Sequence, residues 1–190
     1  MPANLSAGFW VFTSIGILAS FFQSVLSVYI LYLYFYKNKS WNSKTEYQLI
    51  LFRVLLDALN GVSSIVYFSS SIPILVYNFP FDFSFMAGLV GQNFLEMRSF
   101  LAAIIVIERV LATALPLAFY KFRSRISNIP TFIFILSTGL SVDMVLFGFC
   151  DFRLPLDPSC TSFACATPSC YVDYGATTRV IYSSTNAVFS

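Results

Sequence analysis

Residues 3–36 carry no charged side chain, and this single run decides the solvent in which the chain folds. An α-helix rises about 1.5 Å per residue, so about 20 apolar residues cross the hydrocarbon core of a bilayer. The run exceeds that length and predicts a membrane-spanning helix over residues 9–36. A cleaved signal peptide is the alternative, but residues 1–8 lack the basic side chain with which such peptides begin.

The composition of the whole chain agrees with a membrane protein. Hydrophobic residues make up 57% of the 190 residues and charged residues 11%, whereas about a quarter of the residues of a soluble domain are charged. The net charge of +2 is too small for a nucleic-acid-binding surface, and the lack of histidine removes Ser-His-Asp catalysis and most catalytic zinc sites. We therefore expect contact with the lipid bilayer, no nucleic-acid partner, no cofactor and no enzymatic activity.

Three more apolar stretches follow, and a cysteine-rich segment comes after them. We predict spans over residues 49–77, 85–115 and 129–149. Residues 150–178 hold all four cysteines together with prolines and mixed charges, which is typical of a folded loop. Residues 179–190 are too few to cross the membrane and are predicted to begin a fifth helix. The predicted fold is an all-α integral membrane protein with one membrane domain, a bundle of four transmembrane helices plus the start of a fifth.

Basic residues are distributed unevenly among the predicted connections. Short loops rich in Lys and Arg stay on the cytoplasmic side, and the connection between the second and third spans carries only Asp82. The sequence thus predicts a multi-pass plasma-membrane protein with an extracellular N-terminus and an extracellular cysteine segment, where disulfides persist. The basic residues are Lys37, Lys39 and Lys44 in the first connection and Lys121, Arg123 and Arg125 in the third.

The cysteines are candidates for disulfides rather than for a metal site. Cys160, Cys165 and Cys170 are spaced five apart, and Cys150 ends the fourth span. Four cysteines permit three pairings, and the sequence does not choose between them. Zinc is the alternative, but two separate C-x₂₋₄-C pairs are its usual signature and no histidine completes a mixed site, so we predict no metal.

A glycosylation sequon lies near the start of the chain. Asn4-Leu5-Ser6 fits the acceptor pattern and falls on the predicted outer side, close to the membrane. We therefore take Asn4 as a candidate glycosylation site.

Asp57 is an ionisable residue inside the second predicted span. Such groups cost a few kcal/mol in a membrane, face the bundle interior and tend to mark function. Arg53 stands one helical turn before Asp57 and is a possible intrahelical partner. A functional aspartate and a simple ion pair both stay open.

Polar residues recur in the outer half of the third predicted span. Gln92, Glu96 and Ser99 follow helical spacing, and Glu96 lies about 20 Å along the helix from Arg109. That depth suits a small-molecule pocket, bordered also by Arg98 and by Asp143 of the fourth span. The alternative is that Glu96, Arg98 and Asp143 only neutralise one another within the bundle.

Glu108 and Arg109 close the third predicted span. As a dipeptide they fit interfacial charges that extend toward the cytoplasm. The longer string E-R-V-L-A-x-x-L-P-L, which ends at Pro116 and Leu117, resembles the D/E-R-Y-x-A-x-x-x-P-L stretch of rhodopsin-like seven-helix receptors.

The resemblance extends to nematode serpentine chemoreceptors, most closely to class BC. It rests on residues 107–112, 116–128 and 146–152 and on the loop cysteines. It implies a G-protein-coupled receptor that detects small environmental chemicals in sensory neurons and binds a small-molecule ligand and a heterotrimeric G protein.

The same resemblance implies roles for particular residues. Arg109 would be held by Glu108 at rest and released to meet the G protein, while Pro116 and Leu117 would begin a coupling loop. Asp57 would take the place of the sodium-binding aspartate of those receptors.

Two departures from the receptor pattern affect this interpretation. The third span begins Ser84-Phe85-Met86, without the cysteine that usually bridges to the second outer loop, so the loop is expected to be bonded to itself or to Cys150. Spans six and seven are missing, so we expect a fragment, a truncated gene product or a non-signalling remnant. The alternative function is a four-span scaffold whose cysteine loop binds another protein.

Overall fold

The computed structural model describes residues 7–38, 45–77, 81–123, 127–154 and 163–189, and within these ranges it is helical, with no strand. Asn4 and Cys160 lie outside the described residues, as do Lys39, Lys44 and Arg125. The helices are α1 Ala7–Asn38, α2 Thr45–Tyr77, α3 Asp82–Ala114, α4 Pro116–Arg123, α5 Ile129–Met144, continued by the π-helical turn η1 Val145–Phe149, α6 Phe163–Ala166 and α7 Ser169–Phe189.

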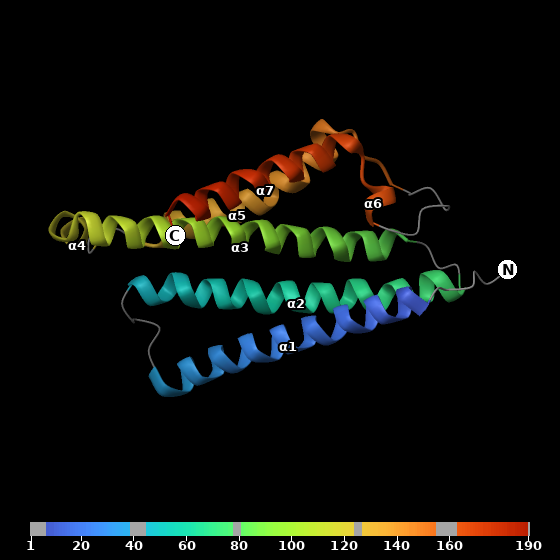
Figure 1. The fold of residues 1–190 in the computed structure, drawn as a ribbon, viewed down its shortest axis with the longest axis horizontal. Helices are drawn as coiled ribbons and strands as arrows, with labels where there is room; N and C mark the ends of the chain where they lie inside the picture. The colour runs from blue at the N-terminus through green and yellow to red at the C-terminus, as the bar shows by residue number, and fades with distance from the viewer. Residues whose placement is uncertain (1–6, 39–44, 78–80, 124–126, 155–162, 190) are drawn as a thin grey trace.

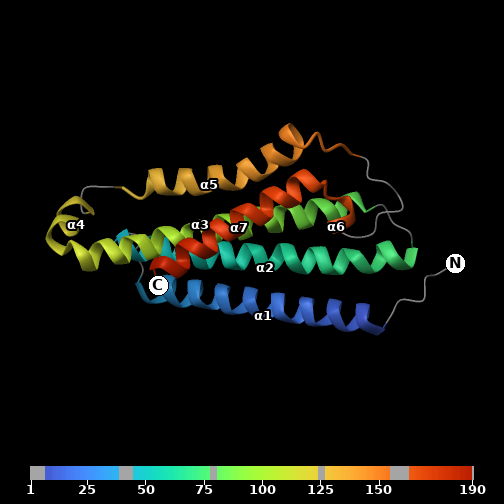
Figure 2. The same ribbon diagram turned by 45° about the horizontal axis from the view of Figure 1, so that its top comes forward.

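Helix α3 is the centre of the bundle. It packs against α2 on one side and against α5 and α7 on the other, and α1 covers the far side of α2 (Figure 1). In a second view α7 crosses α3 obliquely, and α5 runs beside α3 (Figure 2). Because α3 is surrounded in this way, its polar side chains can face protein instead of lipid.

The predicted helical membrane bundle is confirmed. Three helices of the described ranges are long and apolar enough to cross a membrane, over Gly8–Tyr36, Tyr47–Ile72 and Ile129–Phe149. The third predicted span forms α3, which is not among these three helices and carries charged residues along its length. Its 33 residues would extend about 50 Å, which exceeds the thickness of a hydrocarbon core.

Small and polar residues form the contact between α1 and α2. The buried side of α1 carries hydroxyls, while its large aromatic and aliphatic side chains, such as Phe12 and Phe22, are exposed on the outer side. A Cβ on Gly61 would meet the Ser24 hydroxyl and, at 3.0 Å, the Ser20 carbonyl. Close approach through small residues is the usual packing of helices in lipid, where an apolar surface faces outward at no cost. The buried hydroxyls are those of Thr13, Ser20, Ser24 and Ser27.

Aromatic stacking fixes the segment that precedes α7. The ring of Phe85 on α3 is fully buried and stacks on Phe152 at 4.8 Å and on Phe163 of α6 at 5.0 Å between centroids. The same cluster contains Leu146 of η1 and Tyr171 of α7. These contacts hold α6 and the first turn of α7 against the end of α3.

The predicted boundary between the cysteine loop and the fifth helix was wrong. We expected a loop over residues 150–178 and a helix from residue 179, but α7 begins at Ser169. Its first turns carry Asp173 and Gly175, so the segment lacks the continuous hydrophobicity of a span. The buried Tyr171 ring anchors one face of these turns, and packing of one face is sufficient for a helix.

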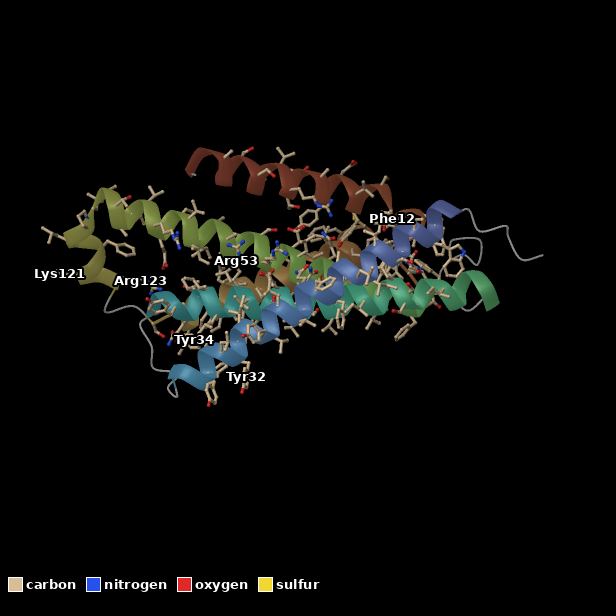
Figure 3. All side chains as sticks on the ribbon, turned by 60° about the horizontal axis from the view of Figure 1, so that its bottom comes forward. Phe12, Tyr32, Tyr34, Arg53, Lys121 and Arg123 are labelled. Atoms are coloured by element: carbon tan, nitrogen blue, oxygen red, sulfur yellow. A yellow bond between two sulfur atoms is a disulfide. The ribbon has the colours of Figure 1, made fainter. Side chains whose placement is uncertain are left out.

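The two ends of the bundle differ in their side chains. Lys121 and Arg123 of α4 lie at the same end as Tyr32 and Tyr34 of α1, whereas Phe12 lies toward the other end (Figure 3). Figure 1 places α6 at that other end. We call these the α4 end and the α6 end.

Candidate functional site

A cavity of about 490 Å³ lies toward the α6 end, between α3 and α7. This volume falls in the range of small-molecule sites. Tyr67 of α2, Val142 of α5 and Phe163 of α6 contribute to its walls, so five helices meet around it. The lining residues are Tyr67, Gln92, Glu96, Val142, Phe163, Thr167, Tyr171, Val172, Tyr174, Gly175, Ala176 and Arg179. We call it the α6-end cavity.

A chain of polar contacts crosses this cavity from α7 to α3. The guanidinium of Arg179 donates to the side-chain oxygen of Gln92 at 3.3 Å, and the Gln92 amide donates to Glu96 Oε1 at 3.1 Å. Glu96 is only 5% exposed, whereas Arg179 is exposed at the rim. A buried carboxylate therefore lines the cavity, and the exposed Arg179 is linked to it through Gln92.

Tyr171 adds a second buried polar group. The residue is 6% exposed, and within the described ranges its hydroxyl has no hydrogen-bond partner. The carboxylates of Glu96 and Asp143 both act electrostatically on it. Buried hydroxyls are normally paired, so Tyr171 offers an unused hydrogen-bonding group at the cavity.

The other predicted pocket residues do not line this cavity. Asp143 accepts two hydrogen bonds from the Asn93 amide, each of 2.9 Å, and so ties α5 to α3 behind the wall. Ser99 donates to the carbonyl of Leu95 in its own helix at 2.8 Å. Arg98 points to α2. Of the residues proposed from the sequence, Gln92 and Glu96 are therefore the ones placed in the cavity wall.

Asp57 and Arg98 form an ion pair between α2 and α3. Arg98 Nε lies 3.0 Å from Asp57 Oδ1. Arg53, one turn away, was one of the possible partners left open by the sequence, and the structure pairs Asp57 with Arg98 instead. The pair also does not fit the sodium site that the resemblance implied, because a guanidinium already supplies the positive charge next to the carboxylate.

Cysteine pairing sets the position of α7. Cys150, which follows η1, is bonded to Cys170 in the first turn of α7. Cys165 of α6 is disulfide-bonded as well, and no described cysteine is free. The bond to Cys150 was one of the arrangements left open by the sequence. It fixes the α7 wall of the cavity to the end of the fourth span.

A polar network closes the α4 end. Arg123 Nε lies 2.9 Å from Glu108 Oε1, and Arg123 also donates to the Asn128 side-chain oxygen. The Asn128 amide in turn donates to Gln48 at 2.9 Å. Arg123 is 8% exposed, so this single side chain links α4 to α3 and to the start of α5.

Arg109 lies beside this network and is exposed. The resemblance implied that Glu108 holds Arg109, but the structure pairs Glu108 with Arg123, and Arg109 has no ion pair within the described ranges. Arg109 and Glu108 line a second cavity of about 440 Å³ together with Thr113 and Phe119. We call it the α4-end cavity. Pro116 is the first residue of α4, a position for which its fixed φ is suited, and Leu117 is exposed.

Several site residues were missed by the sequence reasoning. Arg179, Tyr171 and Tyr174 come from a segment interpreted as loop and helix start. The i, i+3 spacing of the two tyrosines was a usable signal for a helix face. Arg123 was counted only as a cytoplasmic charge, and its burial depends on how α4 folds back.

A helical membrane bundle with a carboxylate-bearing cavity toward one end and an arginine-bearing cavity at the other has the layout of a transmembrane receptor. A family model described as serpentine type 7TM GPCR chemoreceptor Srbc matches residues 5–190, and the chain belongs to this family. No curated protein and no solved structure matches the chain. The resemblance to serpentine chemoreceptors is thereby confirmed, and the family is one of receptors, not enzymes.

Proposed function

We propose that this serpentine chemoreceptor binds a small organic molecule in the α6-end cavity. The observation that carries the proposal is the buried carboxylate of Glu96 at a cavity of about 490 Å³ with aromatic walls. Such a combination of apolar walls and few polar groups is the usual character of a ligand site. The cavity also lies on α3, the helix that contacts most of the bundle.

The proposal extends to coupling at the α4-end cavity. Glu96 and Arg109 lie on the same helix, about 20 Å apart at 1.5 Å per residue, so α3 connects the two cavities directly. Arg109 is exposed there, and the Glu108–Arg123 pair holds α4 beside it. A heterotrimeric G protein is the proposed partner at this end, with Pro116 and Leu117 at the start of its contact region.

The proposed location is the plasma membrane, with the α6 end outside. Lys121 and Arg123 at the α4 end support this orientation, since basic residues stay in the cytoplasm. The Cys150–Cys170 disulfide supports it independently, because such bonds persist outside the cell.

Ligand binding is tested with the 190-residue protein purified in lipid nanodiscs. A panel of small organic molecules is scored by the rise in unfolding temperature, first on the wild type and then on Gly175→Trp. Gly175 lines the cavity and a Cβ there has open space, so the indole fills the cavity without a clash at its root. Gly148→Trp, also with open space but on η1 and not among the lining residues, is the control.

We expect stabilising molecules to act on the wild type and on Gly148→Trp but not on Gly175→Trp. A molecule that stabilises all three proteins equally would place its site elsewhere and contradict the proposal.

Coupling is tested by Arg109→Ala in cells that express the receptor. We expect the second-messenger response to a stabilising ligand to be lost while the amount of receptor at the surface is unchanged. A normal response from this variant would overturn the role proposed for Arg109.

A further inference from the structure

The geometry of the α6-end cavity points to a ligand class. We infer that it selects an organic ammonium ion carried on an apolar or aromatic body, over the alcohol and the carboxylate of the same shape. This inference rests on the proposed function of the cavity as a ligand site and adds the chemistry that the site recognises.

The first observation is the unused hydrogen-bonding capacity of Glu96. Its Oε1 accepts one hydrogen bond, from Gln92, and no described residue donates to its other oxygen. The residue is 5% exposed, so bulk water solvates it poorly. A carboxylate in this state gains most from a charged N–H donor, because charge-assisted hydrogen bonds are about twice as strong as neutral ones.

The second observation is the aromatic wall around that carboxylate. Tyr67, Phe163, Tyr171 and Tyr174 all line the cavity, and they come from three different helices. The face of an aromatic ring attracts a cation, and rings that surround a cation are a recurrent way of binding ammonium groups. The same rings would give a carboxylate nothing comparable.

The third observation is the sign of the charge around the cavity. Besides Glu96, the carboxylate of Asp143 acts on Tyr171 from behind the wall. The opposing charge is Arg179, which also lines the cavity, is exposed at its rim and makes one long hydrogen bond of 3.3 Å to Gln92. The buried charge is therefore negative and the positive charge is exposed at the rim, so the interior of the cavity should repel an anionic ligand and attract a cationic one.

Arg179 then has a defined role as an internal competitor. Its charge acts on Glu96 in the empty cavity. An incoming ammonium group would compete with Arg179 for that interaction. Removal of the Arg179 charge should thus raise the affinity for a cationic ligand and lower the affinity for an anionic one. The change in affinity therefore has opposite signs for the two ligand classes.

The test uses three probes with one carbon skeleton: 2-phenylethylamine, 2-phenylethanol and phenylacetate. Their Kd values are measured at neutral pH on the 190-residue protein in nanodiscs, for the wild type, Glu96→Gln, Arg179→Gln and Gly175→Trp. Glu96→Gln keeps the shape and the hydrogen bond to Gln92 but removes the charge. Unfolding temperatures of all four proteins establish that each is folded.

We expect the amine to bind the wild type more tightly than the alcohol or the acid. Glu96→Gln should weaken binding of the amine by about tenfold or more, which corresponds to the loss of one charge-assisted hydrogen bond. Arg179→Gln should strengthen binding of the amine by about threefold, which is the scale of an exposed charge pair. The affinity for the alcohol should change little in either variant.

Tighter binding of phenylacetate, with loss in Arg179→Gln, would overturn the inference in favour of an anionic ligand. Equal binding of all three probes, or an amine affinity unaffected by Glu96→Gln, would overturn it as well. In each of these cases the cavity remains a ligand site if Gly175→Trp abolishes binding of the probes. Binding that Gly175→Trp does not affect would contradict the proposed function itself.

Discussion

Arg98 Nε lies 3.0 Å from Asp57 Oδ1, and this contact joins the middle of α3 to the middle of α2. The two side chains are 34% and 23% exposed, so the pair is mostly shielded within the bundle. An ion pair in this setting fixes the rotation of α3 about its axis. It thereby determines which residues of α3 face α7 and the α6-end cavity.

Asp57→Asn should destabilise the protein more than the double variant Asp57→Asn/Arg98→Met. The single change leaves an uncompensated guanidinium between helices, at a cost of about 1–3 kcal/mol for a partly exposed pair, whereas the double change removes both charges. Thermal unfolding in detergent measures the difference. Ser99→Ala is a suitable control, since Ser99 bonds only within its own helix. Equal stability of the single and double variants would show that the pair does not orient α3.

Sodium should have no specific effect on this receptor. Arg98 already places a positive charge next to Asp57 Oδ1, which disfavours a metal cation at the same carboxylate. Exchange of NaCl for choline chloride at equal ionic strength should shift the unfolding temperature by less than about 1 °C, since a ligand stabilises a protein only where it binds. A sodium-specific stabilisation that disappears in Asp57→Asn would contradict this prediction.

Removal of one disulfide should open the α6-end cavity. The Cys150–Cys170 bond closes a segment of 20 residues and fixes the α7 wall, and a loop of that length contributes about 3 kcal/mol. The double variant Cys150→Ser/Cys170→Ser avoids mispairing of a single leftover thiol. We expect a lower unfolding temperature and weaker ligand binding, with Ser169→Ala unchanged. Full ligand affinity in the double variant would mean that the disulfide does not position the wall.

Arg123→Gln should release α4. Arg123 is buried and bonded to Glu108 and Asn128, so Arg123→Gln removes the ion pair and weakens the hydrogen bond that hold α4 in place. We expect faster amide hydrogen exchange over residues 116–123. The matched control is Arg153→Gln, which breaks the exposed Arg153–Asp151 pair, because such surface pairs are worth less than about 1 kcal/mol. Identical exchange in the two variants would refute the role of Arg123.

The helices that face lipid were the easiest to predict from the sequence. The second predicted span ends at Tyr77 and the fourth occupies residues 129–149, as α2 and α5 with η1 do. The hydrophobicity of a segment reflects its contact with lipid, so it locates helices whose outer faces meet the membrane. It failed at Ser169, because the first turns of α7 are anchored by the Tyr171 ring and the Cys150–Cys170 bond.

Helical spacing predicted part of the site. Gln92 and Glu96 are one turn apart and so share a face of α3, and both line the α6-end cavity. Arg98 follows Glu96 by two residues, which is about 200° around the helix, so the two side chains must point in opposite directions. That geometry was available from the sequence and excludes Arg98 from the pocket. The Asp57 partner and Arg179 depend on how helices distant in sequence pack, which spacing within one helix does not reveal.

Accessibility of an introduced thiol tests the α6-end cavity most directly. Gly175→Cys places a thiol in the cavity, Gly148→Cys places one outside it, and Thr113→Cys places one in the α4-end cavity, while no described native cysteine is free. The rate of reaction with a methanethiosulfonate reagent is measured with and without a stabilising ligand.

The account predicts that the ligand, at about ten times its Kd, slows the reaction of the Gly175→Cys thiol by about tenfold or more. The reaction rates of the other two variants should be unchanged. Protection of the Thr113→Cys variant instead, or equal rates for the Gly175→Cys variant with and without ligand, would contradict the claim that this receptor binds its ligand between α3 and α7.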